Sequence, residues 1–410
     1  MTRFEKVILS ITGGSHLSVH ALMLALPSLI PVIRNEFNVG LDVLGFVVTV
    51  SGFMFGLGAL PAGWAEKRFG GRTLLLIYQV GSSLSALLVA LSNSFIMMII
   101  GLGFMGFFCS IYHPAGLTLI SHRVKSLTKG MAIHGIFGST GSALGPLLAT
   151  TLAALISWRS AYAFLGIFNG ILAISTFLAI PYRKRADIPE EEFENHNVNT
   201  NKPALIFYFF TSGLMGMAYY GFTTFMPLHF AENTTSILPN LTANMKAGLF
   251  PTMVFIAGIG GQLIGARIGE RFYKPTAYIY IIMANIPFLI LMGYSSDIFL
   301  IISGIFLGIA YFSSQPIGNT LIANFTNSQN RGIGYGISFF ISFGIGSFSA
   351  GFSGLIAENI GINAVFPAMG ILLIPSVIFA FFMSRAAVSY THLRAHETKA
   401  NLVCRLLLEK

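Results

Sequence analysis

The sequence predicts an all-α membrane protein with twelve transmembrane helices in two six-helix pseudo-symmetric repeats. Three observations predict it: the composition, the spacing of the apolar runs and an internal repeat. Of the 410 residues, 54% are hydrophobic and only 10% are charged, whereas a soluble globular chain carries roughly 25% charged residues. A surface so poor in charge is stable only when lipid surrounds much of it. In lipid, only helices or closed barrels satisfy the hydrogen bonds of the backbone, and the apolar runs lack the alternation of polar and apolar residues that is typical of barrel strands.

Twelve runs approach or exceed the roughly 20 apolar residues that cross a bilayer as a helix. They cover residues 7–32, 43–62, 73–92, 95–120, 130–156, 160–181, 204–230, 244–265, 276–294, 298–322, 332–357 and 363–383. The first run follows Lys6 directly and lacks a small-residue cleavage site. We therefore expect it to be a membrane span and not a signal peptide.

Basic residues predict the orientation of these spans. With the N-terminus in the cytoplasm, the outer loops hold only Arg34, Arg159 and Lys246. The inner segments hold Arg3, Lys6, Lys67, Arg68, Arg72, Arg123, Lys125, Lys129, Arg183, Lys184, Arg185, Lys202, Arg267, Arg271, Lys274, Arg331 and Arg385. This bias indicates a multi-pass protein of the bacterial inner membrane with both termini in the cytoplasm. The same scatter of basic residues excludes a nucleic-acid-binding surface.

An internal repeat predicts the division of the chain. The segment 113–120 matches 315–322 at five of eight positions, with an offset of 202 residues. We expect an N-terminal bundle (1–181), a cytoplasmic linker (182–203) and a C-terminal bundle (204–385), because parallel six-helix repeats are one layout of secondary transporters. Residues 386–410 resemble translated sequencing-adapter read-through, so we interpret them as a non-native tail without function.

A charged loop between the second and third spans carries the first family resemblance. Residues 63–72 read GWAEKRFGGR and resemble the loop signature of the major facilitator superfamily, Gly-x-x-x-Asp-Arg-x-Gly-x-Arg, with Lys67 in place of the Asp. A partial second copy covers residues 266–272. The resemblance implies a gating latch of charged groups near cytoplasmic helix ends. Its residues are Gly63, Glu66, Arg68, Gly70, Arg72, Glu270 and Arg271.

The fifth span carries a second resemblance. Gly141, Gly145 and Pro146 resemble the Gly-x-x-x-Gly-Pro signature of antiporters in this superfamily, and the glycines permit close helix packing. Together with the segment 112–116 (YHPAG), they are most similar to the fosmidomycin-resistance branch, which comprises drug/proton antiporters. This resemblance implies proton-coupled efflux of a small, drug-like or anionic molecule by a functional monomer without a cofactor.

In the fold that the resemblance implies, the first, fourth, seventh and tenth helices line a central cavity. Polar residues on these helices are the candidates for binding substrate and protons, because such residues are costly in lipid. They are His16, His20, Tyr112, His113, Tyr219, Tyr220, Gln315 and Asn319. No Asp or Glu lies in the middle of a predicted span. Histidine, which titrates near neutral pH, is therefore the expected proton carrier.

Other interpretations of these residues are weaker. His16 and His20 share one helix face and can in principle bind a metal, but no carboxylate or Cys joins them, so we expect no metal site. His134 is expected to be structural and His229 to be solvated. The alternative functions are an importer of organic anions by proton symport and a non-transporting membrane sensor. No catalytic motif is present, so we do not expect an enzyme.

Overall fold

The structure, a computed structural model, describes residues 1–182, 200–327 and 331–408. It is 89% helical, and the described residues form no strand. The elements include a π-helix, η2, and a 3₁₀-helix, η3. They are α1 (Arg3–Phe37), α2 (Leu41–Phe69), α3 (Gly71–Ala90), α4 (Phe95–Ser110), α5 (Tyr112–Arg123), α6 (Leu127–Leu155), α7 (Trp158–Ala179), α8 (Lys202–Asn233), α9 (Ala243–Arg271), α10 (Lys274–Tyr294), α11 (Asp297–Phe325), α12 (Arg331–Phe339), η2 (Phe340–Ile345), α13 (Phe348–Asn359), η3 (Ile362–Ala364) and α14 (Val365–Leu408).

The predicted all-α membrane fold is confirmed. Among the described residues, eleven helical segments are long and apolar enough to cross a membrane, with α4 and α5 forming one segment and α12 to α13 another. The twelfth predicted span is α6, which is 29 residues long but rich in Gly, Ser and Thr. Because α6 packs against both α1 and α9, much of it faces protein and needs less apolar side chain than a lipid-facing helix.

The fourth span is broken at the position of two candidate site residues. It consists of α4 and α5, which meet at Ile111. Pro114 lacks a backbone N–H and cannot donate to the carbonyl of Ser110, so the regular helical ladder is interrupted there. Tyr112 and His113 therefore lie at the start of a new helix, immediately beside the break.

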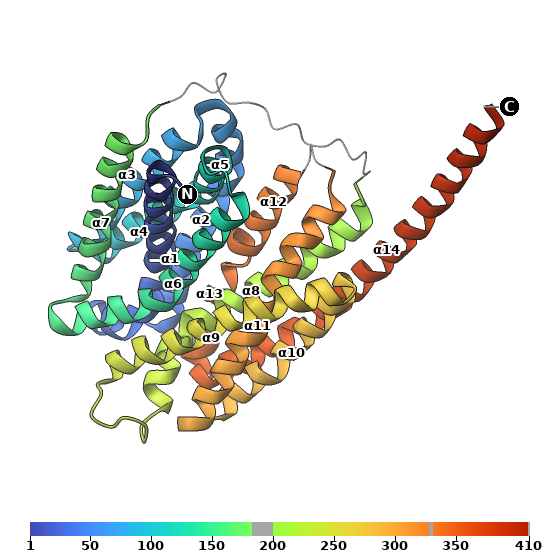
Figure 1. The fold of residues 1–410 in the computed structure, drawn as a ribbon. Coiled ribbons are helices and arrows are strands. Elements are labelled where there is room, and N and C mark those ends of the chain that lie inside the picture. The colour runs from blue at the N-terminus through green and yellow to red at the C-terminus, as the bar shows by residue number, and fades with distance from the viewer. Residues whose placement is uncertain (183–199, 328–330, 409–410) are drawn as a thin grey trace.

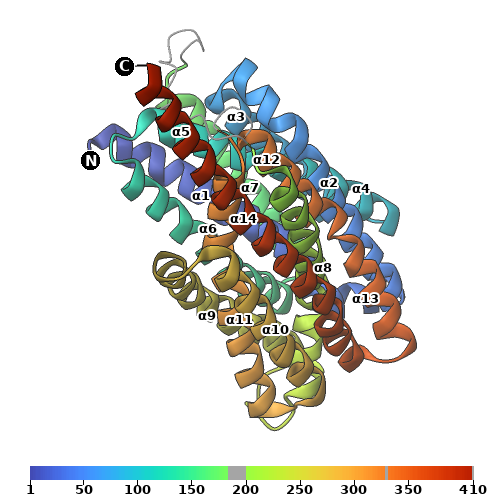
Figure 2. The same ribbon diagram turned by 90° about the vertical axis from the view of Figure 1, so that its right-hand side faces the viewer.

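The helices of the two chain halves form two neighbouring groups (Figure 1). In the first group α1 packs on α6, and α3 packs on α7. In the second, α8 packs on α14, and α9 packs on α11. Figure 2 shows α14 passing in front of α8 and continuing beyond the other helices. Residues 183–199 of the predicted linker lie outside the described part, so the predicted division into domains remains a prediction.

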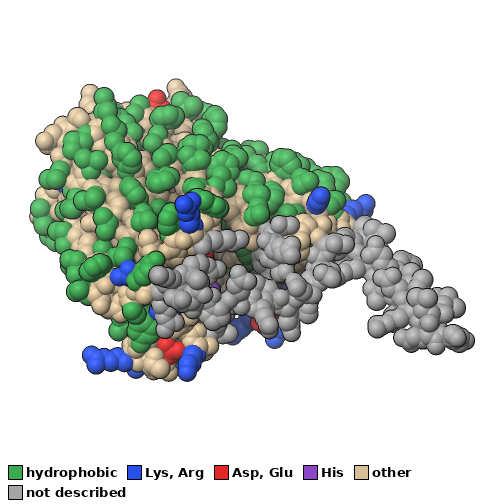
Figure 3. All heavy atoms as spheres, turned by 90° about the horizontal axis from the view of Figure 1, so that it is seen from above, with side chains coloured by type: hydrophobic (Ala, Val, Ile, Leu, Met, Phe, Trp, Pro, Cys, Tyr) green, Lys and Arg blue, Asp and Glu red, His purple; other side chains and the backbone are tan. Residues whose placement is uncertain are grey.

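The outer surface of the bundle is strongly hydrophobic. Figure 3 shows hydrophobic side chains over most of the visible face and few acidic ones. Large apolar side chains such as Leu178, which is 76% exposed, occur on most of the helices. Water would make such a surface costly, at roughly 25 cal/mol for each Å² of apolar area. Lipid removes this cost, so the surface agrees with a membrane-embedded fold.

Two sets of helix contacts join the groups, those of α2 with η2 and α13 and those of α6 with α9. In the first set, Gly45 and Gly56 of α2 approach the backbone of Ala350 and Gly344 so closely that a Cβ atom would lie 2.4 and 2.2 Å from backbone atoms. Thr49 also donates to the carbonyl of Ser347 at 2.8 Å. In the second set, Thr252 of α9 donates to the carbonyl of Ala143 of α6 at 2.6 Å.

Glycines on one face of α6 bring this helix against α1. A Cβ atom at Gly141 would lie 2.2 Å from the carbonyl oxygen of Leu17, and one at Gly145 would lie 2.7 Å from the Cα of Ala21. Gly138, one turn earlier, leaves room for the ring of His16, to which its Cβ would approach within 2.3 Å. The Gly-x-x-x-Gly motif is therefore the surface that packs α6 on α1.

This packing predicts that Gly141→Ala destabilises the protein, because the added methyl meets the backbone of α1 and not a side chain that can move. Overpacking of this kind costs about 1–3 kcal/mol. The matched control is Gly135→Ala on the same helix, where an added Cβ meets nothing within 4 Å. Thermal unfolding of the purified proteins checks this prediction: equal melting temperatures for the two variants would contradict it.

Candidate functional site

Four histidines and a tyrosine gather where α1, α5 and α6 meet. His16 is central: its ring centroid lies 4.9 Å from that of His20, 5.2 Å from those of both Tyr112 and His113, and 4.0 Å from that of His134. Four of the predicted site residues are therefore in contact. His134, predicted to be only structural, stacks on His16 and is part of the same cluster. We call these five residues the histidine cluster.

Hydrogen bonds fix how the rings of the cluster are protonated. The Nδ1 atom of His16 lies 2.8 Å from the carbonyl oxygen of His134. A carbonyl can only accept, so Nδ1 of His16 carries a proton, and in the neutral ring its Nε2 holds a lone pair. This Nε2 lies 3.2 Å from Nε2 of His20. His20 therefore donates an N–H···N hydrogen bond to His16.

Tyr112 links the cluster to the backbone of α1. Its hydroxyl group donates to the carbonyl of Thr12 at 2.5 Å and lies 3.2 Å from Nδ1 of His134. Since its single proton is directed to Thr12, the Tyr112 oxygen accepts the Nδ1–H of His134. Tyr112 is fully buried. Tyr112 was predicted to bind substrate or protons. In the structure its hydroxyl group holds Thr12 and His134 in place, so a direct contact with substrate is less favoured.

A buried polar network behind the cluster was not predicted from the sequence. The hydroxyl group of Tyr78 donates to the carbonyl of Ser15 at 2.9 Å, and the Gln79 amide donates to the Ser15 hydroxyl at 2.9 Å. Asn169 donates to the hydroxyl of Ser18 at 2.7 Å. These residues join α1 to α3 and α7. The sequence signal that could have predicted this network is the presence of polar residues within the predicted spans, because buried polar groups need hydrogen-bond partners in lipid.

His20 and His113 are the accessible members of the cluster. Both are partly exposed, whereas His16 and His134 are buried. The ring of His113 lies 5.3 Å from that of Phe339 on α12 and 6.3 Å from that of Phe55 on α2. His113 thus faces the second group of helices. Their partial exposure makes these two imidazoles the candidates for contact with a ligand.

The two tyrosines predicted on α8 have different environments. Tyr219 is partly exposed and stacks on Tyr311 of α11, with ring centroids 5.2 Å apart. Tyr220 is buried and packs against Gly52 of α2 and the ring of Phe343. Tyr220 therefore contributes to the contact between the groups. Tyr219 is the better candidate for contact with a ligand.

The polar candidates on α11 contact other residues of the second group. Gln315 accepts a hydrogen bond from the Gln262 amide of α9 at 3.2 Å. The backbone carbonyl of Asn319 accepts from the hydroxyl of Tyr335 at 2.9 Å. Both side chains are exposed. Their role in binding substrate remains a prediction.

His229 differs from its predicted solvated state. It is fully buried, and its Nε2 donates to the carbonyl of Met292 at 2.8 Å. The Nδ1 of His229 accepts from the amide of Asn233 at 3.1 Å. His229 therefore joins α8 to α10 as a structural residue. It belongs to the second half of the chain, whereas the histidine cluster belongs to the first half.

The predicted latch residues make local contacts in this structure. Gly70 has a φ of +77°, which favours glycine, and its N–H donates to the carbonyl of Glu66. Arg72 donates to the carbonyls of Ile180 at 2.5 Å and Phe177 at 3.1 Å. A cation at the C-terminal end of α7 is favoured by the helix dipole. Arg72 thus ties α3 to α7 within the first group of helices.

The exposed latch residues lie on the surfaces of α2 and α9. Arg68 lies over the rings of Trp64 and Phe69, its neighbours in α2. Gly63, Glu270 and Arg271 are exposed. The side chain of Lys67 lies outside the described part of the structure. A latch between the two groups therefore remains a prediction.

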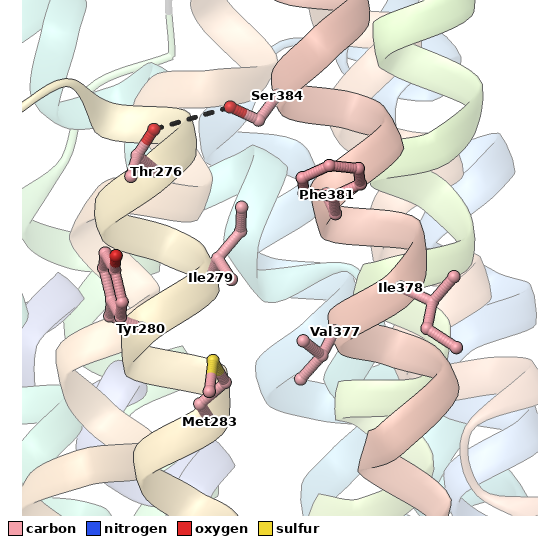
Figure 4. A pocket seen from close by; sticks show the side chains of 8 residues that line it. All are labelled: Thr276, Ile279, Tyr280, Met283, Val377, Ile378, Phe381 and Ser384. Carbon is pink, nitrogen blue, oxygen red and sulfur yellow. Dashed lines mark hydrogen bonds between the residues drawn. The ribbon is translucent and has the colours of Figure 1, made fainter.

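A cavity of about 510 Å³ lies elsewhere, between α10 and α14 (Figure 4). Its lining is apolar apart from the groups at one end, where the hydroxyls of Thr276 and Ser384 lie 3.5 Å apart. None of the predicted site residues lines it. Without a charged group or a cluster of polar side chains, this cavity is a weaker candidate for a site than the histidine cluster.

Comparison with known proteins gives the family. The sequence profile of the Major Facilitator Superfamily matches residues 12–272 and 230–408. The Fosmidomycin resistance protein of Escherichia coli is 22% identical over 391 residues, which cover 90% of this chain and 92% of the relative. A probable sulfoacetate transporter of Cupriavidus necator is 20% identical over 287 residues, 64% of each chain.

Solved structures show the same fold. A bacterial homolog of the human lysosomal transporter Spinster, crystallised in an inward-facing and unoccupied conformation, superposes with a TM-score of 0.77 at 14% sequence identity. The match covers 95% of this chain and 98% of that one. The predicted superfamily is thereby confirmed, and the chain belongs to the Major Facilitator Superfamily.

Proposed function

We propose that this protein is a secondary transporter that exports a small anionic molecule in exchange for protons, with the histidine cluster as the shared site. The observation that carries the proposal is the cluster itself. Ionisable residues within membrane spans are costly and mark ion or substrate pathways by default. Four imidazoles in contact are the main ionisable group that the described spans place together.

The cluster has the chemistry that the exchange needs. A neutral imidazole can bind a proton and then becomes a cation that attracts an anion, and an anion beside it favours the charged form. His20 and His113 are partly exposed and are the candidates to bind both the proton and the anion. Two relatives support an anion by name, the sulfoacetate transporter and a probable L-galactonate transporter of Escherichia coli.

The contacts between the two groups of helices support alternating access. One set of these contacts lies beside the turn between α1 and α2, where Glu358 of α13 accepts from the backbone N–H of Leu41 at 2.8 Å and lies 3.7 Å from Arg34. The basic-residue bias assigns this turn to the outside of the cell. In this conformation the outer end is held together, and opening to the outside requires these contacts to break.

The first prediction of this proposal concerns the direction of transport. Export in exchange for protons predicts that everted membrane vesicles with an acidic lumen accumulate the substrate, because the cytoplasmic face is then outside and protons leave the lumen as the substrate enters. The Fosmidomycin resistance relative makes fosmidomycin the first compound to assay. Uptake by intact cells without accumulation in everted vesicles would favour the alternative, an importer of organic anions.

The second prediction concerns the cluster. His113→Gln keeps a polar side chain but cannot take up a proton, so we expect gradient-driven transport to fall at least tenfold while the protein still inserts. His229→Gln is the matched control, because His229 is a buried structural histidine outside the cluster. Transport by reconstituted protein at a fixed gradient checks this prediction. Wild-type transport by His113→Gln would rule out His113 as a carrier.

The third prediction concerns the outer end. Glu358→Gln keeps an acceptor for Leu41 but removes the charge that faces Arg34. Half-exposed ion pairs contribute up to about 1 kcal/mol, so the open population should rise by up to about fivefold. The control is Glu36→Gln, since Glu36 pairs with Arg159 at 2.7 Å within the first group. Single-molecule distances between labels at positions 38 and 359 measure the shift. An equal effect of both substitutions would contradict this assignment.

A further inference from the structure

Three imidazoles of the histidine cluster converge on one point. They belong to His16 and His20 of α1 and to His113 of α5, and one ring nitrogen of each lies within 4.8 Å of the other two. The expected absence of a metal site was based on His16 and His20 alone. In the structure, His113 at the start of α5 adds a third imidazole to this pair.

The spacing of the first two nitrogens already fits a metal ion. Zinc binds imidazole nitrogen at about 2.0–2.1 Å, which places two ligands of a tetrahedral site about 3.3 Å apart. The Nε2 atoms of His16 and His20 are 3.2 Å apart. His113 is partly exposed and its ring lies edge-on to those of His16 and His20, so rotation about its side-chain bonds moves its ring nitrogens relative to the pair.

The orientation of His16 is also that of a metal ligand. Ligating histidines usually donate their other ring N–H to a carbonyl or carboxylate, which fixes the ring and directs its lone pair to the metal. His16 donates its Nδ1–H to the carbonyl of His134 at 2.8 Å. Its Nε2 lone pair therefore points to His20. When the proton of His20 moves from Nε2 to Nδ1, both Nε2 atoms are free to bind an ion.

We propose that His16, His20 and His113 bind one divalent transition-metal ion of the zinc class. Imidazole ligands favour Zn²⁺, Ni²⁺ and Cu²⁺ over Mg²⁺ and Ca²⁺. Three protein ligands leave a fourth position for water or an exogenous anion. An anion is favoured there, because no carboxylate in the ligand set balances the charge of the ion in this apolar surrounding. The proposal does not depend on the direction or the coupling of transport.

Zinc titration of the purified protein tests the proposal. The full chain is prepared without a polyhistidine tag and with His392→Ala, His396→Ala and Cys404→Ala, which removes the potential zinc ligands of the tail. Calorimetry should give one Zn²⁺ per chain. His20→Gln and His113→Gln should each lower the affinity more than about 100-fold, since loss of even a supporting partner costs 10–100-fold. Co²⁺ in place of Zn²⁺ should give the visible absorption of a tetrahedral site.

Two further variants separate loss of a ligand from loss of folding. His113→Cys keeps a zinc ligand and should retain binding, whereas His229→Gln removes a buried histidine outside the site and should bind as the wild type does. Size-exclusion chromatography confirms that each variant is folded. Wild-type affinity in folded His113→Gln, or no zinc bound by the folded wild-type chain, would overturn the proposal.

Discussion

The close packing of α6 on α1 is the contact on which the candidate site depends. Gly138, Gly141 and Gly145 allow the two helices to approach so closely that the carbonyl of His134 reaches the ring of His16. This hydrogen bond sets the protonation of His16 and leaves Nε2 as an acceptor for His20. A larger side chain on this face of α6 would separate the helices and remove the arrangement. The motif resembling an antiporter signature thus acts through the geometry of a helix pair.

Several buried polar groups around the cluster find their hydrogen-bond partners within the first half of the chain. Tyr78 and Tyr112 donate to backbone carbonyls of α1, and Asn169 reaches Ser18 from α7. In lipid an unpaired polar group costs several kcal/mol, so such bonds fix the positions of the helices as well as their stability. A rigid site in one half, with His113 facing α12 of the other, agrees with two groups of helices that move as units.

The sequence predicted the fold well, because the length and apolarity of a span are properties of single segments. The twelfth span, α6, is rich in Gly, Ser and Thr, and it packs against protein on two sides. Contacts between segments could not be read in the same way. His16, His20, Tyr112 and His113 were predicted to share a site, whereas His134 and the network of Tyr78 and Asn169 were not. Their partners are distant in the sequence, and His229 was wrongly expected to be solvated for the same reason.

His16 presents an unprotonated Nε2 to His20 because its Nδ1–H is held by the carbonyl of His134. Nitrogen-15 NMR of the histidine side chains, in protein reconstituted into lipid at a pH above 7, measures this directly. We expect a proton on Nδ1 of His16 and a coupling between the two Nε2 atoms across the hydrogen bond. A proton on Nε2 of His16, without that coupling, would contradict it.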